Sequence, residues 1–422
     1  MAKFAIDLTP LKKYPDFRNL WSAGLISYFG SMITYVALPF QLKELTGSYI
    51  AVGALGVVEL VPLIIFGLYG GVLADSVNRK KMVWATEASA MVLVLILLLN
   101  SFLSHPTIVA IYLVAALFAV VDGLQRPSMD AMLPRLVNHE DLPAASALLS
   151  LRWQLGVIIG PTIGGVIFAT FSVSVGFMVD IATYLIALIF LAKVRSIPPS
   201  KEAEKPSLAA LFDGVKYALS RQDLLGTYII DLAAMTLAMP MALYPFWADD
   251  LGAPWALGFF YAAITVGSVI VTLTSGWTRT YRFHGRAVIV AAMGWGLAIA
   301  LSGLSNSIVV VLLCLTVAGS CDMVSALFRG NIWNQTIPDE LRGRLAGIEL
   351  LSYSVGPLLG QLRAASVAAA TTLTISVTSG GLLCFLVVGI LALFLPKMWK
   401  YDVTTNEFAV REREIRKNRE NS

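Results

Sequence analysis

The sequence Gly70-Gly71-Val72-Leu73-Ala74-Asp75-Ser76-Val77-Asn78-Arg79-Lys80-Lys81 separates two apolar runs. Each run is long enough to cross a bilayer, so the two predict a tight hairpin of spanning helices. The tip of the hairpin carries one carboxylate and three cations, and the cations predict a position on the cytoplasmic side. The glycines at the end of the first helix let a neighbouring helix approach closely.

The composition predicts a membrane protein. Of 422 residues, 57% are hydrophobic and only 14% are charged, which is rare in soluble domains. Cys314, Cys321 and Cys384 lie in apolar runs without ligand spacing, so we expect neither a metal site nor a disulfide framework. Loop lysines and arginines explain the net charge of +4, which gives no nucleic-acid footprint.

The hydrophobic pattern predicts an all-α membrane protein with twelve transmembrane helices in two pseudo-symmetric six-helix bundles. The predicted spans are 19–45, 49–74, 82–103, 106–133, 144–171, 174–193, 225–248, 253–276, 287–305, 307–336, 345–372 and 374–396. Nearly all lysines and arginines then fall in the N-terminus, the even-numbered connections and the tail, whereas the predicted outer loops hold Lys43. This asymmetry predicts a multi-pass protein of the cytoplasmic (inner) membrane with both termini in the cytoplasm.

The chain divides into four predicted parts, which are an N-terminal bundle at 1–193, a cytoplasmic linker at 194–224, a C-terminal bundle at 225–397 and a charged cytoplasmic tail at 398–422. In the linker, Ser207 is placed to cap a short amphipathic helix lying on the membrane surface. The many charges of the tail predict loose order.

The two halves resemble each other at intervals of about 200 residues, as two six-helix repeats require. Gly160-Pro161 recurs as Gly356-Pro357, and Asp122 has a counterpart in Asp322. Duplicated halves around a central site are typical of secondary transporters.

The quoted charged loop resembles the Gly-x-Leu-Ala-Asp-Arg-x-Gly-Arg-Lys loop of the major facilitator superfamily. Ser76 and Asn78 stand where the superfamily usually has Arg and Gly, and asparagine tolerates a left-handed turn. Other stretches are similar to the enterobactin-exporter and macrolide-efflux branch, including its actinobacterial members, namely Asp16-Phe17-Arg18, Leu45-Thr46-Gly47-Ser48, Phe259-Phe260-Tyr261-Ala262-Ala263, Asp322-Met323-Val324-Ser325-Ala326-Leu327-Phe328-Arg329 and Pro338-Asp339-Glu340-Leu341-Arg342-Gly343-Arg344. The resemblance covers nearly the whole chain and implies the major facilitator fold, but it leaves the substrate open.

The resemblance also implies a cytoplasmic gate around Gly71, Asp75, Arg79 and Lys80. In the superfamily the loop aspartate pairs with the loop arginine and sits at the N-terminus of helix 11, where the helix dipole favours a carboxylate. This contact would hold the gate shut in the outward-facing state. The alternative is that these charges only fix the topology.

The fifth predicted span resembles the antiporter motif of drug-exporting facilitators at Gly156, Gly160, Pro161, Gly164 and Gly165. Ala147 departs from this motif, because a further glycine is expected there. Pro161 frees a backbone carbonyl and bends the helix. The alternative is generic packing of small residues between membrane helices.

Ionisable residues inside the predicted spans are functional candidates, because charge is costly in lipid. Helices 1, 4, 7 and 10 line the cavity in this superfamily, which ranks Asp231 first and Asp322 second as proton-coupling carboxylates. Asp231 has no opposite charge nearby in sequence, so we expect it to be unpaired and able to exchange protons. Asp322 and Arg329 share a helix face but are too far apart for an easy direct bond. The alternative for each carboxylate is a structural ion pair with an arginine of another helix.

Glu59 and Asp122 are the remaining proton-coupling candidates. Glu59 is either a proton site or a group bonded to backbone that Pro62 frees, and Asp122 can pair with Arg126 four residues later. Asp180 belongs to an outer helix, so we expect a structural part for it.

The substrate-cavity candidates are Arg126, Arg329, Arg363, Tyr35 and Tyr244. Arg363 either attracts an anionic substrate or extends to the outer interface, and we expect Arg152 to extend to the cytoplasmic interface. The tyrosines lie on cavity helices and can stack on a ring-bearing substrate, although interfacial belts and helix packing explain most membrane aromatics.

The sequence therefore predicts a secondary active transporter. We expect it to export an amphipathic small molecule (a siderophore, a macrolide or another drug-like compound) by proton antiport with alternating access. The alternatives are a facilitator-type importer or uniporter, and a non-transporting membrane receptor or assembly factor with the same fold. We expect no enzyme activity, cofactor or metal. The expected partners are the substrate, protons and the lipid bilayer, with no nucleic acid, and we expect a monomer.

Overall fold

The computed structural model describes the backbone of residues 7–198 and 216–420. Side chains are described for the same residues except 68–76, 130, 339–344, 346–352 and 416–420. The predicted interfacial helix after Ser207 therefore lies largely outside the description, apart from a helical stretch at 216–220.

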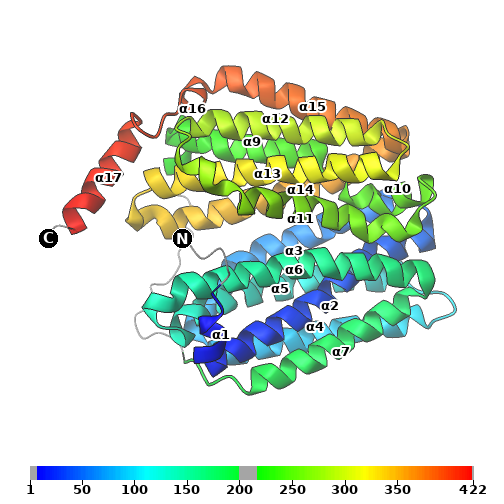
Figure 1. Ribbon diagram of the computed structural model, residues 1–422. Helices are drawn as coiled ribbons and strands as arrows, with labels where there is room; N and C mark the ends of the chain where they lie inside the picture. The colour runs from blue at the N-terminus through cyan, green and yellow to red at the C-terminus, as the bar shows by residue number, and fades with distance from the viewer. Residues whose placement is uncertain (1–6, 199–215, 421–422) are drawn as a thin grey trace. The chain divides into compact units, whose positions relative to one another are not determined.

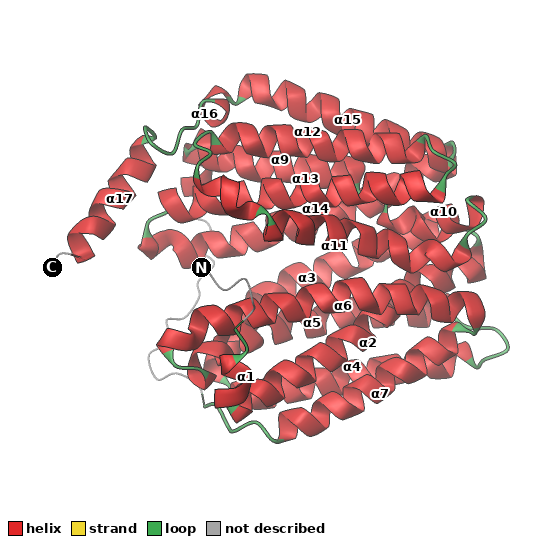
Figure 2. Ribbon diagram, in the orientation of Figure 1, coloured by secondary structure: helices red, strands yellow, loops and turns green. Residues whose placement is uncertain are grey.

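All regular structure in the described residues is helical, and no strand occurs among them (Figure 2). The long helices are α2 (Pro15–Thr46), α3 (Tyr49–Ser76), α4 (Arg79–Ser101), α5 (Ile108–Leu136), α6 (Leu142–Thr170), α7 (Val173–Ala192), α9 (Gln222–Ala238), α11 (Leu257–Leu273), α12 (His284–Gly303), α13 (Ile308–Thr336), α14 (Asp339–Ala370) and α15 (Leu373–Phe394) (Figure 1). Shorter helices are α1 (Thr9–Lys13), α10 (Tyr244–Asp250), α16 (Pro396–Trp399) and α17 (Glu407–Glu420), with 3-10 turns η1 (His139–Asp141), η2 (Met241–Leu243), η3 (Pro254–Ala256) and η4 (Ser275–Arg279).

The predicted all-α membrane fold is confirmed. Within the described residues, eleven of the twelve predicted spans form helical segments that are long and apolar enough to cross a membrane. The remaining predicted span, 345–372, which is the eleventh in order, falls in α14, a helix of 32 residues whose first turns include side chains outside the description.

The predicted seventh span is wrong as a single helix. The sequence predicts one helix over 225–248, whereas α9 ends at Ala238 and a short turn, η2, leads into α10. Pro240 explains the break, because its ring removes a backbone donor and disfavours helical geometry in the preceding residue. Met239 accordingly adopts extended backbone, with φ −99° and ψ 104°.

The chain forms two compact units by its internal contacts, unit 1 (Met1–Pro206 and Ala248–Ala262) and unit 2 (Ser207–Trp247 and Ala263–Ser422). In unit 1, α2 packs on α6 and α7, and α4 packs on α5 and α7. In unit 2, α9 packs on α14 and α15, and α12 packs on α13 and α15. The two units thus pair their helices in the same order, which supports the internal repeat.

Residues 248–262 belong to unit 1 by their contacts, although the predicted bundles place them in the C-terminal half. Lys43 at the end of α2 forms an ion pair with Asp249. A β-carbon added at Gly165 of α6 would lie 3.0 Å from Cα of Gly258, so the two backbones touch. Residues 248–262 cover the end of the predicted seventh span and the start of the eighth. Sequence periodicity gives no information on which helices these residues contact.

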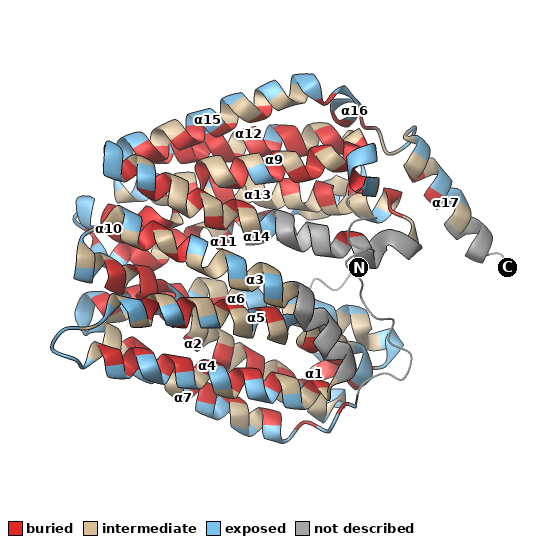
Figure 3. Cartoon of the chain, turned by 180° about the vertical axis from the view of Figure 1, so that it is seen from behind, coloured by how far each residue is buried: buried red, intermediate tan, exposed pale blue. Residues whose placement is uncertain are grey.

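Buried apolar side chains join the helices of unit 1 near the predicted cytoplasmic end. Phe17 of α2, Val83 of α4, Met132 of α5 and Leu148 of α6 are all fully buried in one cluster. Exposed residues recur along the helices (Figure 3). They include large apolar residues, for example Leu99 at 58%. Such exposed apolar residues are typical of lipid contact and would be a liability in water.

The predicted loose order of the tail is wrong for most of its described residues. Residues 407–420 form α17, which packs against α13. The centroid of the Phe408 ring lies 3.7 Å from the guanidinium carbon of Arg221. Tyr401 and Ala409 are buried. Apolar residues spaced among the charges therefore anchor the tail to unit 2.

Candidate functional site

An ion pair between Asp231 of α9 and Arg329 of α13 lies in the interior of unit 2. Asp231 is 4% exposed and Arg329 is 6% exposed. Asp231 is therefore not unpaired: the structure shows the stated alternative, an ion pair with an arginine of another helix, almost a hundred residues away in the chain. A buried pair of this kind is costly to desolvate, and removing one partner leaves an uncompensated charge.

Asp322 adds a second carboxylate to this pair. It lies on α13 about two turns before Arg329, and it interacts electrostatically with both Arg329 and Asp231. No described group forms a hydrogen bond or ion pair with Asp322, and Nε of Arg329 has no partner among the described groups. Two carboxylates therefore share one guanidinium that keeps a spare donor.

Aromatic side chains hold α9 and α13 together one turn away from this cluster. Nε1 of Trp333 donates a hydrogen bond to Oγ1 of Thr227 over 2.9 Å. The ring of Tyr228 stacks on Trp333 with 5.4 Å between centroids. This packing fixes the register of the two helices, so the charged residues face each other.

The candidates of unit 1 form a more open group. Asp122 and Arg126 are exposed on α5, and Glu59 is half-buried on α3. Asp122 interacts electrostatically with both Arg126 and Glu59. The structure thus brings these three together, and their parts in proton coupling and substrate binding stay predictions.

Unit 1 also holds two buried carboxylates on α4 and α7. Asp180 of α7 is fully buried and accepts hydrogen bonds from Thr34 and Thr183, which agrees with a structural part. Glu87 of α4 is 5% exposed, and sequence reasoning missed it. The rule that ionisable groups inside spans are functional candidates would have found Glu87, since it lies within the third predicted span.

Arg363 of α14 forms hydrogen bonds at the point where α9 ends before η2. Its guanidinium donates to the carbonyl oxygen of Leu237, in the last turn of α9, and to that of Ser376 over 3.0 Å. The side chain therefore satisfies a carbonyl that the interrupted helix leaves without its usual partner. This arrangement favours a structural part, and substrate attraction stays a prediction.

The two candidate tyrosines differ in exposure. Tyr35 is 38% exposed and makes an edge contact with Tyr261, with 5.8 Å between centroids. Tyr244 is fully buried and packs near Trp247. Tyr35 is therefore partly exposed, whereas Tyr244 belongs to the packing of unit 2, and substrate contact of either tyrosine stays a prediction.

Arg152 of α6 does not extend along the membrane interface as expected. Its side chain lies over Gly24 of α2, where an added β-carbon would sit 2.9 Å from the guanidinium carbon. The absence of a side chain at Gly24 lets this cation enter the interior of unit 1.

The glycine face of α6 packs directly on α2. A β-carbon at Gly156 would contact the ring of Tyr28, and one at Gly160 would lie 2.8 Å from the carbonyl oxygen of Phe29. Gly164 continues the same face against Ile33. Close packing is thus one use of the antiporter-like motif, whose part in transport stays a prediction.

The candidate gate loop is described in part. Asn78 makes no use of the left-handed turn that asparagine tolerates. It has φ −68° and caps α4, its side-chain oxygen accepting a hydrogen bond from the N–H of Lys81. Nζ of Lys80 donates to the carbonyl oxygen of Ala192 at the end of α7 over 2.9 Å. Arg79 is buried. The side chains of Gly71 and Asp75 lie outside the described residues, so the predicted Asp75–Arg79 pair stays a prediction.

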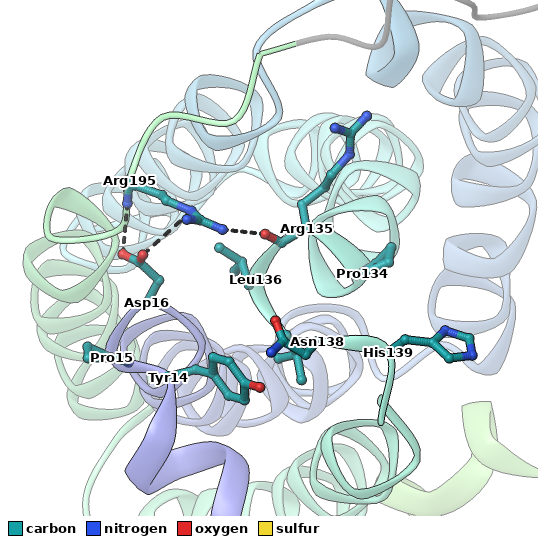
Figure 4. A pocket seen from close by; sticks show the side chains of 10 residues that line it. Tyr14, Pro15, Asp16, Pro134, Arg135, Leu136, Asn138, His139 and Arg195 are labelled. Atoms are coloured by element: carbon teal, nitrogen blue, oxygen red, sulfur yellow. Dashed lines mark hydrogen bonds and ion pairs between the residues drawn. The ribbon is translucent and has the colours of Figure 1, made fainter. Parts of the chain in front are cut away.

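A pocket of about 430 Å³ opens in unit 1 between the start of α2 and the end of α5 (Figure 4). Arg195 crosses it, donating from its backbone N–H to Asp16 over 2.9 Å and from its guanidinium to the carbonyl oxygen of Arg135. Its lining includes none of the candidate coupling residues. This pocket is therefore not part of the candidate coupling site.

Comparisons with known proteins agree with this architecture. A family model described as transmembrane secretion effector matches residues 5–419. The chain is 30% identical over 392 residues to the enterobactin exporter EntS of Shigella boydii serotype 18, which covers 92% of this chain and 94% of that protein. It is 29% identical, with the same coverage, to the enterobactin exporter EntS of Escherichia coli O81.

Solved transporter structures share the fold. The nucleoside transporter NupG superposes with a TM-score of 0.71 at 14% identity, covering 92% of this chain and 100% of that one. A bacterial homologue of the human lysosomal transporter Spinster gives a TM-score of 0.70 at 11% identity, covering 92% and 96% of the two chains. At such low identity these likenesses speak for the fold alone.

Proposed function

Because the chain belongs to the transmembrane secretion effector family, we propose that it exports an amphipathic small molecule by proton antiport. Its apolar helices and its family make it a multi-pass transporter of the cytoplasmic membrane. The relatives named enterobactin exporters support outward transport of a siderophore or a similar compound. Without a nucleotide-binding motif in the sequence, an ion gradient or the substrate's own gradient is the expected energy source.

The observation that carries the coupling proposal is the charge cluster of unit 2. Asp231, Asp322 and Arg329 provide two carboxylates and one guanidinium, which together hold one excess negative charge when both carboxylates are ionised. One proton neutralises that charge. Buried charge is costly in a membrane, so proton binding here carries a large energetic weight.

Proton binding also changes which groups are paired. When Asp231 is protonated, Arg329 loses its partner on α9 and keeps Asp322, on its own helix, as the remaining carboxylate. The contact between α9 and α13 is then held by Trp333, Thr227 and Tyr228 without the ion pair. Two protonation states thus favour two arrangements of these helices, as alternating access requires.

The test uses purified protein in liposomes that contain a pH dye. Enterobactin, a macrolide and a cationic dye are added in turn, and proton movement and probe flux are recorded together. We expect probe-evoked proton movement that is lost in Asp231→Asn and in Asp322→Asn. Asp250→Asn, at an exposed carboxylate at the end of α10, is the matched control and should behave as the wild type.

The outcomes separate the candidate functions. Probe flux without proton movement would contradict antiport and favour a uniporter. Proton movement that persists in both variants would move the coupling site elsewhere, with Asp122 and Glu59 next in order. A protein that moves none of the probes and no protons would contradict export of these compounds and favour a non-transporting role.

A further inference from the structure

Glu87 lies on α4 where three helices of unit 1 meet. Its Oε1 accepts a hydrogen bond from Oγ of Ser27 on α2 over 3.1 Å, and another from Nε2 of Gln125 on α5 over 2.9 Å. The residue is 5% exposed, and its Oε2 has no partner among the described groups. Oε1 therefore accepts two hydrogen bonds, while Oε2 is buried and accepts none from the described groups.

No ion pair to Glu87 occurs within the described part of the chain. Arg152 of α6 acts on it electrostatically but forms no ion pair with it. Asp180 and Tyr184 of α7 interact with it electrostatically as well. On its own helix, Arg79 precedes Glu87 by about two turns. Charged groups therefore surround Glu87, but none of the described ones forms an ion pair that would hold it in the ionised form.

The remaining packed helices bring few charges to this position. From α5, the direct contact is the neutral amide of Gln125, and Asp122 of the same helix interacts with Tyr184. From α3, the described carboxylate is Glu59, which interacts with Asp122. No described hydrogen bond or ion pair thus joins Glu87 directly to Asp122, Arg126 or Glu59.

We propose that Glu87 is a proton-binding site of unit 1, which takes up and releases a proton at Oε2. This site goes beyond the proposed function, because proton binding at Glu87 does not depend on which compound is exported or on coupling at Asp231. It is a second candidate place where the protein can load a proton during a cycle.

The hydrogen bonds of Glu87 suit both protonation states. Ser27 and Gln125 are neutral donors, and Oε1 accepts from them whether the group is a carboxylate or a carboxylic acid. A proton can therefore arrive at Oε2 or leave it while both bonds stay in place. An intramembrane carboxylate that lacks a bonded cation is otherwise expensive, which is why such groups are functional candidates by default.

Asp180, in the same unit, is a buried carboxylate whose two oxygens both accept hydrogen bonds. Thr34 donates to one of its oxygens, and Thr183 donates to the other over 3.2 Å. Gly30 of α2 leaves the space that Asp180 occupies beside the helix backbone. Both oxygens of Asp180 are thus bonded, whereas Glu87 keeps one oxygen open.

Infrared difference spectroscopy of the purified protein in lipid tests this proposal without a substrate. Spectra are recorded as the pH is changed from acidic to alkaline, and the band of protonated carboxyl groups is followed. We expect Glu87→Gln to lose one titrating carboxyl component, and Glu87→Asp to keep it with a shifted midpoint. Glu140→Gln, at an exposed glutamate of η1, is the matched control and should leave the buried component unchanged.

A Glu87→Gln spectrum identical to that of the wild type would overturn the proposal. So would a Glu87 component that is present but does not change with pH. If Glu87→Gln fails to fold, Glu87→Asp still decides, because a proton site must respond to the shortened side chain. The result is independent of the liposome assay, so failure of proton antiport and failure of this site are distinguishable.

Discussion

At the scale of the residue, Arg329 is the side chain on which the buried charge of unit 2 depends. It forms an ion pair with Asp231 and interacts electrostatically with Asp322. Its Nε donates no hydrogen bond to a described group. Arg126, its approximate counterpart in unit 1, is exposed. The two halves therefore keep similar residue types at related positions but bury only one of the two arginines.

Replacing Arg329 should be strongly destabilising by itself. Arg329→Gln leaves Asp231 buried without its cation, and breaking a buried pair in this way costs about 3–5 kcal/mol of unfolding free energy. The double variant Asp231→Asn with Arg329→Gln should recover part of that loss, because both charges of the pair are then removed and Asp322 alone keeps its charge. Thermal unfolding of both variants in detergent measures the difference, and equal stability of the two would contradict the ion pair.

At the scale of the element, backbone contacts of glycines set the helix packing. Gly123 of α5 lies against the backbone of α3, since an added β-carbon would sit 2.7 Å from the amide nitrogen of Gly67. In unit 2, Ser268 of α11 and Ser320 of α13 each donate to a glycine carbonyl on the other helix, over 3.1 and 3.2 Å. The related helix pairs of both units thus approach through glycine.

Gly160 gives a direct test of this packing. In Gly160→Ala the new methyl would meet the backbone of α2 at Phe29, and overpacking of this kind costs about 1–3 kcal/mol. Gly276→Ala is the matched control, because nothing lies within 4 Å of a β-carbon there. Thermal unfolding should show a lower midpoint for the first variant only, and an unchanged Gly160→Ala protein would argue against the close α2–α6 contact.

At the scale of the whole molecule, the C-terminal segment is part of unit 2. Asp402 pairs with Arg282 at 3.4 Å, and the N–H of Val403 donates to the carbonyl oxygen of Arg282 over 3.1 Å. Arg221 holds Asp223, donates to the carbonyl oxygen of Thr336 over 2.8 Å and lies over Phe408. The end of the linker and the tail therefore meet at the same end of α13.

The attachment of the tail should depend on pH. Hydrogen bonds from Thr404, together with Arg282, hold the pKa of Asp402 below its ordinary value. A lowered pKa in the folded state gives stability that is present above the unfolded pKa of about 4 and is lost as the pH falls through the folded value. Hydrogen exchange of residues 400–410, expressed relative to the intrinsic amide exchange rate at each pH, should therefore be slow at neutral pH and faster in acid.

Asp402→Asn should give the faster exchange already at neutral pH, because the amide cannot replace the charged contact with Arg282. An exposed control, Glu140→Gln, should leave exchange in this segment unchanged. Exchange that responds to neither acid nor Asp402→Asn would show that the tail is held by its apolar contacts alone.

The sequence by itself determined the membrane class, the helical fold and the positions of the helices, because all three follow from long apolar runs and their boundaries. It also placed Asp231, Asp322 and Arg329 on the right helices, since charges inside such runs are rare. It did not show that Asp231 and Arg329 are partners, that Arg152 turns inward over Gly24, or that the seventh span breaks before Pro240.

Only the tertiary structure decided those points, because they depend on which helix faces stand opposite one another. Periodicity defines the faces of a single helix, whereas a partner from another helix is set by packing across many residues of chain. Glu87 shows the same division, since its place in a span can be read from the sequence. Its bonds to Ser27 and Gln125 and its vacant oxygen exist only where α2, α4 and α5 converge.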